Sequence, residues 1–265
     1  MKNRSVLLSF DVEEFDMPLE YNQSIQLEEQ LEVGRKGLET VTPILDQHNV
    51  SCTLFTTATY AINFPGTIRA LAQRHEIASH TYYHSYFENQ HLLESKNKLE
   101  EITGKVVTGL RMPRMRKVEM EEVIKAGYQY DSSINPTYLP GRYNNFHLPR
   151  TMYSDNGMLR IPASVTPHLR IPLFWLAFKN MPYRFFKNLA IQTLKKDDYL
   201  CLYFHPWEFT DIQPYALPGY TKRWCVNILA DRLNKLIGDL KMQGDFTTIQ
   251  SWLQSKGPAA LTTRP

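Results

Sequence analysis

Two histidines four residues apart, His80 and His84 in the segment H-T-Y-Y-H, are the residues whose types and spacing point most directly to chemistry. Within one helical turn, this spacing would aim both imidazoles at one point, as metal binding by two histidines requires. The spacing alone is weak evidence, because eight histidines in 265 residues produce such a pair by chance often enough to matter. A capped, solvent-facing histidine pair is the alternative interpretation.

Acidic residues directly after an apolar segment offer the oxygen ligand that a zinc-type catalytic site with two histidines needs. Asp11 and Glu13 follow the segment Val6–Phe10, and in an extended chain residues at i and i+2 point to the same face. One of the two could bind the metal while the other acts as a base. The alternative is that Asp11–Asp16 forms a solvated acidic turn.

Short apolar segments alternate with longer segments of helical period, which predicts an α/β fold of parallel strands joined by helices. The predicted strands are Val6–Phe10, Ser51–Thr56, Glu76–Ser79, Val106–Arg111, Tyr128–Ser133 and Tyr199–His205. Helices are predicted at 27–46, at 65–72 and over Arg223–Met242, where Ile228, Leu229, Leu233, Leu236, Ile237 and Leu240 are the candidates for burial.

Polar clusters stand at the carboxyl ends of these strands, where the loops of α/β barrels converge and assemble the active site. The clusters are Asp11–Glu14, His80–His84, Arg111–Arg114, Asp131 and His205–Glu208. The residues that could do chemistry are therefore expected at one end of one sheet.

The bulk composition bounds the class of protein. The chain of 265 residues is 43% hydrophobic, enough for a substantial core, and we expect one domain over residues 1–265. A net charge of +3 with scattered basic residues argues against nucleic acid as a partner. Cys52, Cys201 and Cys225 have no C-x-x-C spacing and fit a reducing compartment. Without a signal peptide or an apolar run long enough to span a bilayer, the chain as given is expected to be cytoplasmic.

Five motifs resemble those of the polysaccharide deacetylase (NodB-homology) family in their order and approximate spacing. They are S-F-D-V-E at 9–13, S-H-T-Y-Y-H at 79–84, R-M-P at 111–113, D-S-S at 131–133 and L-Y-F-H-P-W-E at 202–208. The resemblance runs from about residue 5 to residue 250, and the D-V-E and H-P-W-E forms are most similar to the branch associated with exopolysaccharide and surface-glycan loci. It implies a distorted (β/α) barrel of seven strands.

The resemblance also implies one divalent metal, held by His80, His84 and one acidic residue. Zinc is the expected metal, and cobalt, nickel or iron would also suit such ligands. The commoner family pattern has two adjacent aspartates, whereas Val12 stands at the second position here and cannot bind metal. Glu13 is then the substitute ligand. The alternative is a site of two histidines and extra water, with weaker affinity.

Four further residues receive catalytic roles from the family pattern. Asp11 would be the general base that takes a proton from the attacking water, and His205 would protonate the leaving amine. Asp131 would hold His205 in its protonated form, and Arg111 would orient Asp11 through charge-assisted hydrogen bonds. The implied reaction is removal of an N-acetyl group from an amino sugar in a surface glycan or a lipid-linked oligosaccharide.

Trp207, Tyr83 and Arg114 are the candidates for substrate binding. A tryptophan next to a catalytic strand end often stacks on a sugar, although a core tryptophan closing the barrel is the alternative. Tyr83 lies near the histidine pair and could line a glycan groove or simply pack. Arg114 stands in the third motif where an aromatic residue is common.

Residues 167–196 interleave apolar, aromatic and basic residues, a composition that suits an interfacial segment in weak contact with a membrane. Two helices covering the barrel are the alternative. Two rival functions stay open: a cyclic-amide hydrolase on the same fold, against which both histidines argue, and a carbohydrate-binding protein without catalysis, against which Asp11 and His205 argue.

Overall fold

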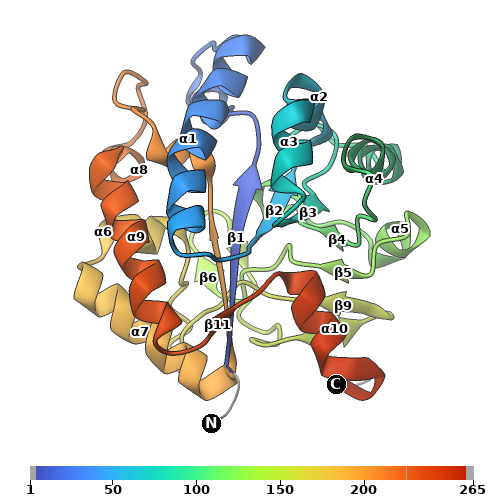
Figure 1. Ribbon diagram of the computed structural model, residues 1–265, viewed down its shortest axis with the longest axis vertical. Helices are drawn as coiled ribbons and strands as arrows, with labels where there is room; N and C mark the ends of the chain where they lie inside the picture. Colours follow the sequence, from blue (N-terminus) through green and yellow to red (C-terminus); the bar gives the residue numbers. More distant parts are fainter. Residues whose placement is uncertain (1–3, 225, 261–265) are drawn as a thin grey trace.

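The computed structural model describes residues 4–224 and 226–260, the last four of these by their backbone only. Its centre is a curled sheet in which seven consecutive neighbours run parallel, in the order β10-β1-β2-β3-β4-β5-β9 (Figure 1). Their bounds are Tyr199–Phe204 (β10), Ser5–Val12 (β1), Thr53–Thr56 (β2), Glu76–Ser79 (β3), Gly109–Leu110 (β4), Tyr130–Asp131 (β5) and Met158–Arg160 (β9). The prediction of an α/β fold of the distorted barrel type is confirmed.

Five short strands were not predicted, and one of them is β9 of the parallel series. Tyr153–Asp155 (β8) pairs antiparallel with β9, and Asp245–Phe246 (β11) pairs with the start of β1, which brings the main sheet to nine strands in the described ranges. Tyr138–Leu139 (β6) and Tyr143–Asn144 (β7) form a separate hairpin. β4 and β5 are only two residues long, much shorter than the predicted strands at those positions.

The gap between β9 and β10 is bridged by Ser164, which follows β9 in the chain. Its backbone N–H donates to the Cys201 carbonyl oxygen at 2.9 Å, and its Oγ accepts from the Cys201 N–H at 2.9 Å. At this point Ser164 thus joins the two edges of the curled sheet in place of a strand ladder.

Helices surround the sheet, as Figure 1 shows. Their bounds are Leu27–Gln47 (α1), Ala58–Asn63 (α2), Pro65–Leu71 (α3), Gln90–Thr103 (α4), Met120–Lys125 (α5), Trp175–Asn180 (α6), Tyr183–Asp197 (α7), Gly219–Lys222 (α8), Asn227–Lys241 (α9) and Ile249–Ala260 (α10), with short 3-10 helices at Met17–Tyr21 (η1), Pro113–Met115 (η2) and Pro206–Phe209 (η3). Apolar faces at helical spacing, such as Leu31, Leu38 and Leu45 in α1, pack against the sheet.

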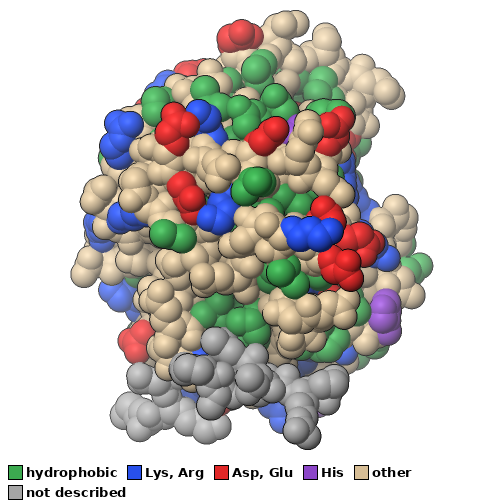
Figure 2. Space-filling model, turned by 90° about the vertical axis from the view of Figure 1, so that its right-hand side faces the viewer, with side chains coloured by type: hydrophobic (Ala, Val, Ile, Leu, Met, Phe, Trp, Pro, Cys, Tyr) green, Lys and Arg blue, Asp and Glu red, His purple; other side chains and the backbone are tan. Residues whose placement is uncertain are grey.

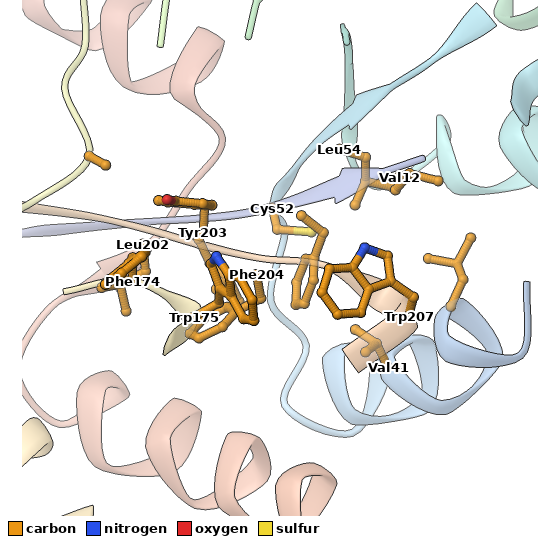
Figure 3. Close-up of a cluster of buried hydrophobic side chains, with 14 of the residues drawn as sticks. Val12, Val41, Cys52, Leu54, Phe174, Trp175, Leu202, Tyr203, Phe204 and Trp207 are labelled. Atoms are coloured by element: carbon orange, nitrogen blue, oxygen red, sulfur yellow. The ribbon is translucent and has the colours of Figure 1, made fainter. Parts of the chain in front are cut away.

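The alternation of side chains along β1 separates the core from the site. Val6, Leu8 and Phe10 join the large core cluster shared with the helices, part of which Figure 3 shows, whereas Leu7 belongs to a second cluster on the other face. Since successive strand residues point to opposite faces, Asp11 shares the face of Leu7 and points into the curled sheet. The strand pattern thus places a carboxylate inside the barrel.

Two sequence predictions about helices need correction. The helix predicted over Arg223–Met242 starts only at Asn227, after Val226 at a φ of 58°, and Ile228 is 56% exposed, not buried. The other five predicted core residues of that helix are buried. Cys225 lies outside the described residues.

The segment 167–196 contains α6 and α7. Phe178, Phe186 and Leu194 of these helices are buried in the core cluster, and α7 packs along β10. Its apolar residues are therefore used largely as a cover for the sheet, which is what the alternative interpretation of this segment predicted.

Side chains of both charge signs are interspersed with apolar ones on the face shown in Figure 2. In the ranges that the structure describes, no helix is long and apolar enough to cross a membrane.

Candidate active site

A cavity of about 350 Å³ opens at the carboxyl ends of the parallel strands. It is lined, among others, by Asp11, Glu13, His80, His84, His205 and Trp207. The register of the sheet explains part of this gathering. Phe10 pairs with Phe204 across the neighbouring parallel strands β1 and β10, so the residues that follow, Asp11 and His205, emerge side by side.

Three of these side chains converge on one point. Glu13 Oε2 lies 3.0 Å from His80 Nε2 and 3.0 Å from His84 Nε2. All three residues are buried, and their ligand atoms lie within 4.8 Å of one another. One carboxylate and two imidazoles is the donor set of many catalytic zinc sites.

The other ring nitrogens of the two histidines face oxygen atoms as well. His80 Nδ1 lies 2.7 Å from the Arg111 carbonyl oxygen, and His84 Nδ1 lies 2.8 Å from Asp16 Oδ1. The carbonyl oxygen can only accept, so His80 Nδ1 carries a proton and neutral His80 presents a lone pair at Nε2. That lone pair would meet another acceptor, Glu13 Oε2, unless a cation lies there. Either a proton or a metal ion satisfies this site, and the donor set fits a divalent metal.

The loop that carries the histidines is not the helical turn that the sequence analysis expected. Residues 80–87 contain no helix, and Thr81 has a φ of 63°. The Thr81 and Tyr82 carbonyl oxygens accept hydrogen bonds from the Ala58 and Thr59 N–H groups at the start of α2, both at 3.0 Å. An anchored irregular loop, rather than helical periodicity, brings His84 back to His80.

Charges inside the site shift the pKa values of its members in opposite directions. Burial on its own would raise the pKa of Glu13, but the positive charges of His84 and His205 outweigh it and hold that pKa well below its usual range. Burial would lower the pKa of His84, yet Glu13 and Asp16 raise it well above the ordinary value. Glu13 is therefore anionic and ready to bind a cation.

Asp11 is held by a fully buried arginine. Arg111 Nη1 donates to Asp11 Oδ1 at 2.7 Å and to Ser9 Oγ at 2.9 Å, while its Nη2 donates to Ser132 Oγ at 3.0 Å. The guanidinium also lies over the Phe55 ring, 4.0 Å from its centroid. Four partners fix the guanidinium, so Asp11 Oδ1 is fixed and Oδ2 is left facing the cavity.

His205 stands beside both carboxylates. Its Nε2 lies 3.7 Å from Asp11 Oδ2 and 4.0 Å from Glu13 Oε1. Burial alone would lower the pKa of His205, but the charge of Glu13 and the contact with Glu208 raise it above its ordinary value. A histidine that holds its proton next to a metal-type site has the properties of a general acid.

The predicted partner of His205 is wrong. Asp131 contacts Ser133 through its backbone N–H and hydroxyl, and its Oδ2 lies 2.9 Å from Arg160 Nε. The carboxylate next to His205 Nδ1 is that of Glu208, at 3.1 Å. Arg160 of β9, the strand that pairs with β5, thus binds the Asp131 carboxylate that was expected at His205.

The three candidate substrate residues lie in different surroundings. Trp207 lines the cavity but is only 2% exposed, and its Nε1 donates to Glu13 Oε1 at 3.0 Å. Arg114 also lines the cavity and forms ion pairs with Asp16 at 2.7 Å and with Glu20 at 2.6 Å. Tyr83 is not among the lining residues, and its ring packs near Tyr82, Tyr86 and His91.

Sequence reasoning missed several lining residues. Asp16 was placed only in a solvated acidic turn, although it contacts both His84 and Arg114. Aromatic residues from three distant segments also line the cavity: Tyr143, Trp175 and Tyr203. Alternation along β10 could have pointed to Tyr203, since His205 lies two residues further on. Nothing in the sequence indicates that the hairpin β6–β7 reaches the cavity.

Taken together, the curled α/β sheet carries at its carboxyl ends a cluster of carboxylates and histidines that could hold a metal ion. The family model for polysaccharide deacetylases matches residues 1–130, a range that includes Asp11, Glu13, His80 and His84 and ends before His205. A search of curated protein sequences gives no match.

Three experimental structures share the fold. A protein described as a polysaccharide deacetylase from Mycobacterium smegmatis is 19% identical with a TM-score of 0.66, over 100% of this chain and 96% of its own. The Puue allantoinase is 17% identical with a TM-score of 0.67, over 99% and 93%. A protein described as a polysaccharide deacetylase from Pseudomonas aeruginosa PAO1 is 17% identical with a TM-score of 0.65, over 94% and 89%.

The family model thus covers 130 of the 265 residues, and the three structures share the fold over nearly the whole chain. At identities below 25%, the three structures bear on the fold and not on the substrate.

Proposed function

We propose that this protein is a metal-dependent hydrolase, one catalytic domain over residues 1–265, that removes an N-acetyl group from an amino sugar. The observation that carries the proposal is the convergence of His80 Nε2 and His84 Nε2 on Glu13 Oε2, with Asp11 and His205 beside them in one cavity. The cluster combines a metal-ligand set with a candidate base, Asp11, and a candidate acid, His205, which is the combination that a catalytic site requires.

His80, His84 and Glu13 are the residues that would hold the metal, and zinc suits this donor set best. When bound there, a divalent metal polarises the substrate carbonyl and lowers the pKa of water. Arg111 contributes through its carbonyl oxygen, which faces His80 Nδ1, as well as through its guanidinium. A single residue thus supports both the ligand and the base.

Asp11 is proposed as the general base. Its Oδ1 is engaged by Arg111, so Oδ2 is the atom that would take a proton from the attacking water. The charge-assisted hydrogen bond from the Arg111 guanidinium holds Asp11 in one orientation, which a base requires.

His205 is proposed as the general acid. Amide cleavage needs one, because an unprotonated amine anion is too basic to leave. His205 Nε2 faces the cavity between Asp11 Oδ2 and Glu13 Oε1, and would transfer its proton to the nitrogen of the leaving amine. Its raised pKa keeps that proton available near neutral pH.

The dimensions of the cavity bear on the substrate. A volume of about 350 Å³ is at the small end of ligand pockets, whose usual range is about 300–1,000 Å³. Arg142 of the hairpin β6–β7 lies across it, 3.2 Å from Glu20 of η1. We propose that the site takes one sugar unit with its acetamido group, within a surface glycan or a lipid-linked oligosaccharide made on the cytoplasmic side.

A second candidate function is hydrolysis of a cyclic amide, and the fold shared with an allantoinase is the observation that favours it. The same base and acid would serve ring opening, and no acetate would be released. The complete ligand set at Glu13, His80 and His84 supports the deacetylase instead. A carbohydrate-binding protein without catalysis would have no use for the Asp11–Arg111 pair.

Weak peripheral contact with a membrane is proposed through 167–196 if the substrate is lipid-linked. Leu169 and Phe185 are 76% and 51% exposed there, and Phe185 stands between Arg184 and Lys187 in the sequence of α7. Liposome co-sedimentation at low and high salt tests this, since basic residues are least screened at low salt. Absence of binding at low salt would leave this segment as a cover for the sheet only.

The experiment for the function is acetate release by the zinc-loaded protein from N-acetylated hexosamines, oligosaccharides and nucleotide sugars, with allantoin as a cyclic-amide probe. Acetate from at least one sugar, absent with Asp11→Asn protein, is the expected result. Ring opening of the cyclic amide without acetate release would establish the second candidate function instead.

A further inference from the structure

A fully buried charge pair lies behind His205, on the side away from Asp11. Glu208 and Lys179 both have 0% exposed side chains, and Lys179 Nζ lies 3.6 Å from Glu208 Oε2. Glu208 comes from η3 directly after β10, whereas Lys179 comes from α6 in the segment 167–196. Burying two charges costs free energy, which indicates that the pair has a functional role.

Glu208 binds His205 at two atoms. Its Oε1 accepts a hydrogen bond from the His205 backbone N–H at 2.8 Å and lies 3.1 Å from His205 Nδ1. A carboxylate oxygen can only accept, so His205 Nδ1 must be the donor in the second contact. The imidazole is then fixed with Nε2 toward Asp11 and the cavity.

Lys179 accounts for the other oxygen of Glu208. Oε2 has no hydrogen-bond partner among the described residues, and a buried carboxylate is costly without a cation beside it. Lys179 Nζ faces it and also donates to the Thr221 carbonyl oxygen at 2.8 Å, which holds the ammonium group in place.

Two tryptophans complete the surroundings of His205. Trp207 stacks on its ring with centroids 4.9 Å apart, and Trp175 of α6 meets it edge-on at 5.3 Å. Lys179 lies one turn along α6 from Trp175, with its Nζ 5.8 Å from that ring centroid. Helix α6 therefore supplies an aromatic ring that packs against His205 and a cation that pairs with Glu208.

We propose that Glu208 and Lys179 are positioning residues that fix His205 for proton donation, in the role that Asp131 does not fill in this chain. The proposal rests on the function proposed above for His205. Lys179 compensates the buried carboxylate of Glu208, Glu208 Oε1 accepts the hydrogen bond from His205 Nδ1, and Nε2 is left to face the leaving group. Neither residue of the pair is among those that line the cavity.

The test uses the full-length protein with Lys179→Met, Glu208→Met and the double substitution. Lys179→Met leaves a lone buried carboxylate and should lower the melting temperature. Adding Glu208→Met removes that charge, so the double variant should regain stability relative to Lys179→Met. The kcat of the double variant should nevertheless stay about 10- to 100-fold below that of wild type, with KM little changed. This loss is a part of the roughly 100- to 10,000-fold that a general acid contributes.

Two matched variants separate positioning from mere stability. Glu208→Gln keeps an acceptor oxygen for His205 and should restore part of the kcat that Glu208→Met loses. Asp197→Asn breaks the ion pair between Arg150 and Asp197, which are not lining residues of the cavity, and should lower stability while leaving kcat unchanged.

A readout without substrate follows the His205 Nδ1 proton by ¹H–¹⁵N NMR, assigned by its loss in His205→Asn. We expect a protected proton in wild type and its loss in Glu208→Met and in the double variant. Recovery of kcat together with stability in the double variant, or an Nδ1 proton unchanged in all variants, would overturn the proposal. If wild type released no acetate from any sugar, the proposed function would fail. The NMR readout would still show whether Glu208 and Lys179 fix the Nδ1 proton of His205.

Discussion

The indole Nε1 of Trp207 donates a hydrogen bond to Glu13 Oε1 at 3.0 Å and so joins residues 194 positions apart in the chain. This bond occupies one carboxylate oxygen and leaves the other, Oε2, facing both histidines. The tryptophan that the sequence suggested as a sugar platform is therefore a support for the candidate metal ligand.

Trp207→Phe should weaken zinc binding by about 10- to 100-fold, the usual effect of removing a group that orients a ligand. Isothermal titration of metal-stripped protein measures this. Trp175→Phe is the matched control, because Trp175 packs 5.5 Å from Trp207 and has no hydrogen bond to Glu13. Equal affinity in Trp207→Phe and wild type would remove Trp207 from the metal site.

Asp11→Asn and Glu13→Gln should differ in whether metal rescues them. Asp11→Asn should keep its metal and lose activity, since an amide cannot accept the water's proton. Glu13→Gln should lose affinity, because two neutral imidazoles remain as ligands, and excess zinc should restore part of the rate. Rescue of Asp11→Asn but not Glu13→Gln by excess zinc would exchange the two roles.

His205→Ala should lower kcat by about 100- to 10,000-fold, the usual contribution of a general acid. Metal content should stay near that of wild type, because His205 is assigned to proton donation and not to ligation. Elemental analysis of the same preparation gives the control. Loss of the metal in this variant would reassign His205 as a ligand.

The strand-end clusters could be predicted from the sequence, because apolar segments of strand length fix where each strand stops. Asp11 and His205 follow two long strands, and parallel pairing of β1 with β10 then places them together. Glu13 was found by the same reasoning, since an extended chain carries it on the face of Asp11.

The side-chain partners of these acidic residues could not be predicted in this way. Asp131 and Glu208 both lie near a strand end, and only the folded structure shows that Arg160 binds Asp131 while Glu208 contacts His205. The conformation of the loop at His80 was not predicted either, because the left-handed backbone at Thr81 and the hydrogen bonds of the loop to α2 have no local sequence signal. Long-range packing decided both.

Stability should fall in acid partly because of His75, which lies outside the cavity. Burial, with a smaller effect of Arg74, lowers the pKa of His75 from 6.5 to about 4. Between these values the unfolded chain binds the proton more readily than the folded one, so stability is present above pH 6.5 and is lost as the pH falls toward 4.

His75→Gln should remove this part of the pH dependence, at most about 3 kcal/mol in the free energy of unfolding. Urea unfolding at pH 7 and at pH 4.5 measures the difference. His147→Gln, at an exposed histidine, is the matched control and should behave as wild type. The same loss of stability in His75→Gln as in wild type would contradict the assignment.

The central claim is that hydrolysis depends on a metal held by Glu13, His80 and His84. Its most direct test is a zinc titration of metal-stripped protein in which bound metal and acetate release are measured on the same samples. We expect acetate release to rise in proportion to bound zinc up to one equivalent, and the His80→Ala/His84→Ala protein to bind no zinc at this site and to release no acetate. Acetate release that is independent of bound metal, or that persists in the double variant, would contradict the claim.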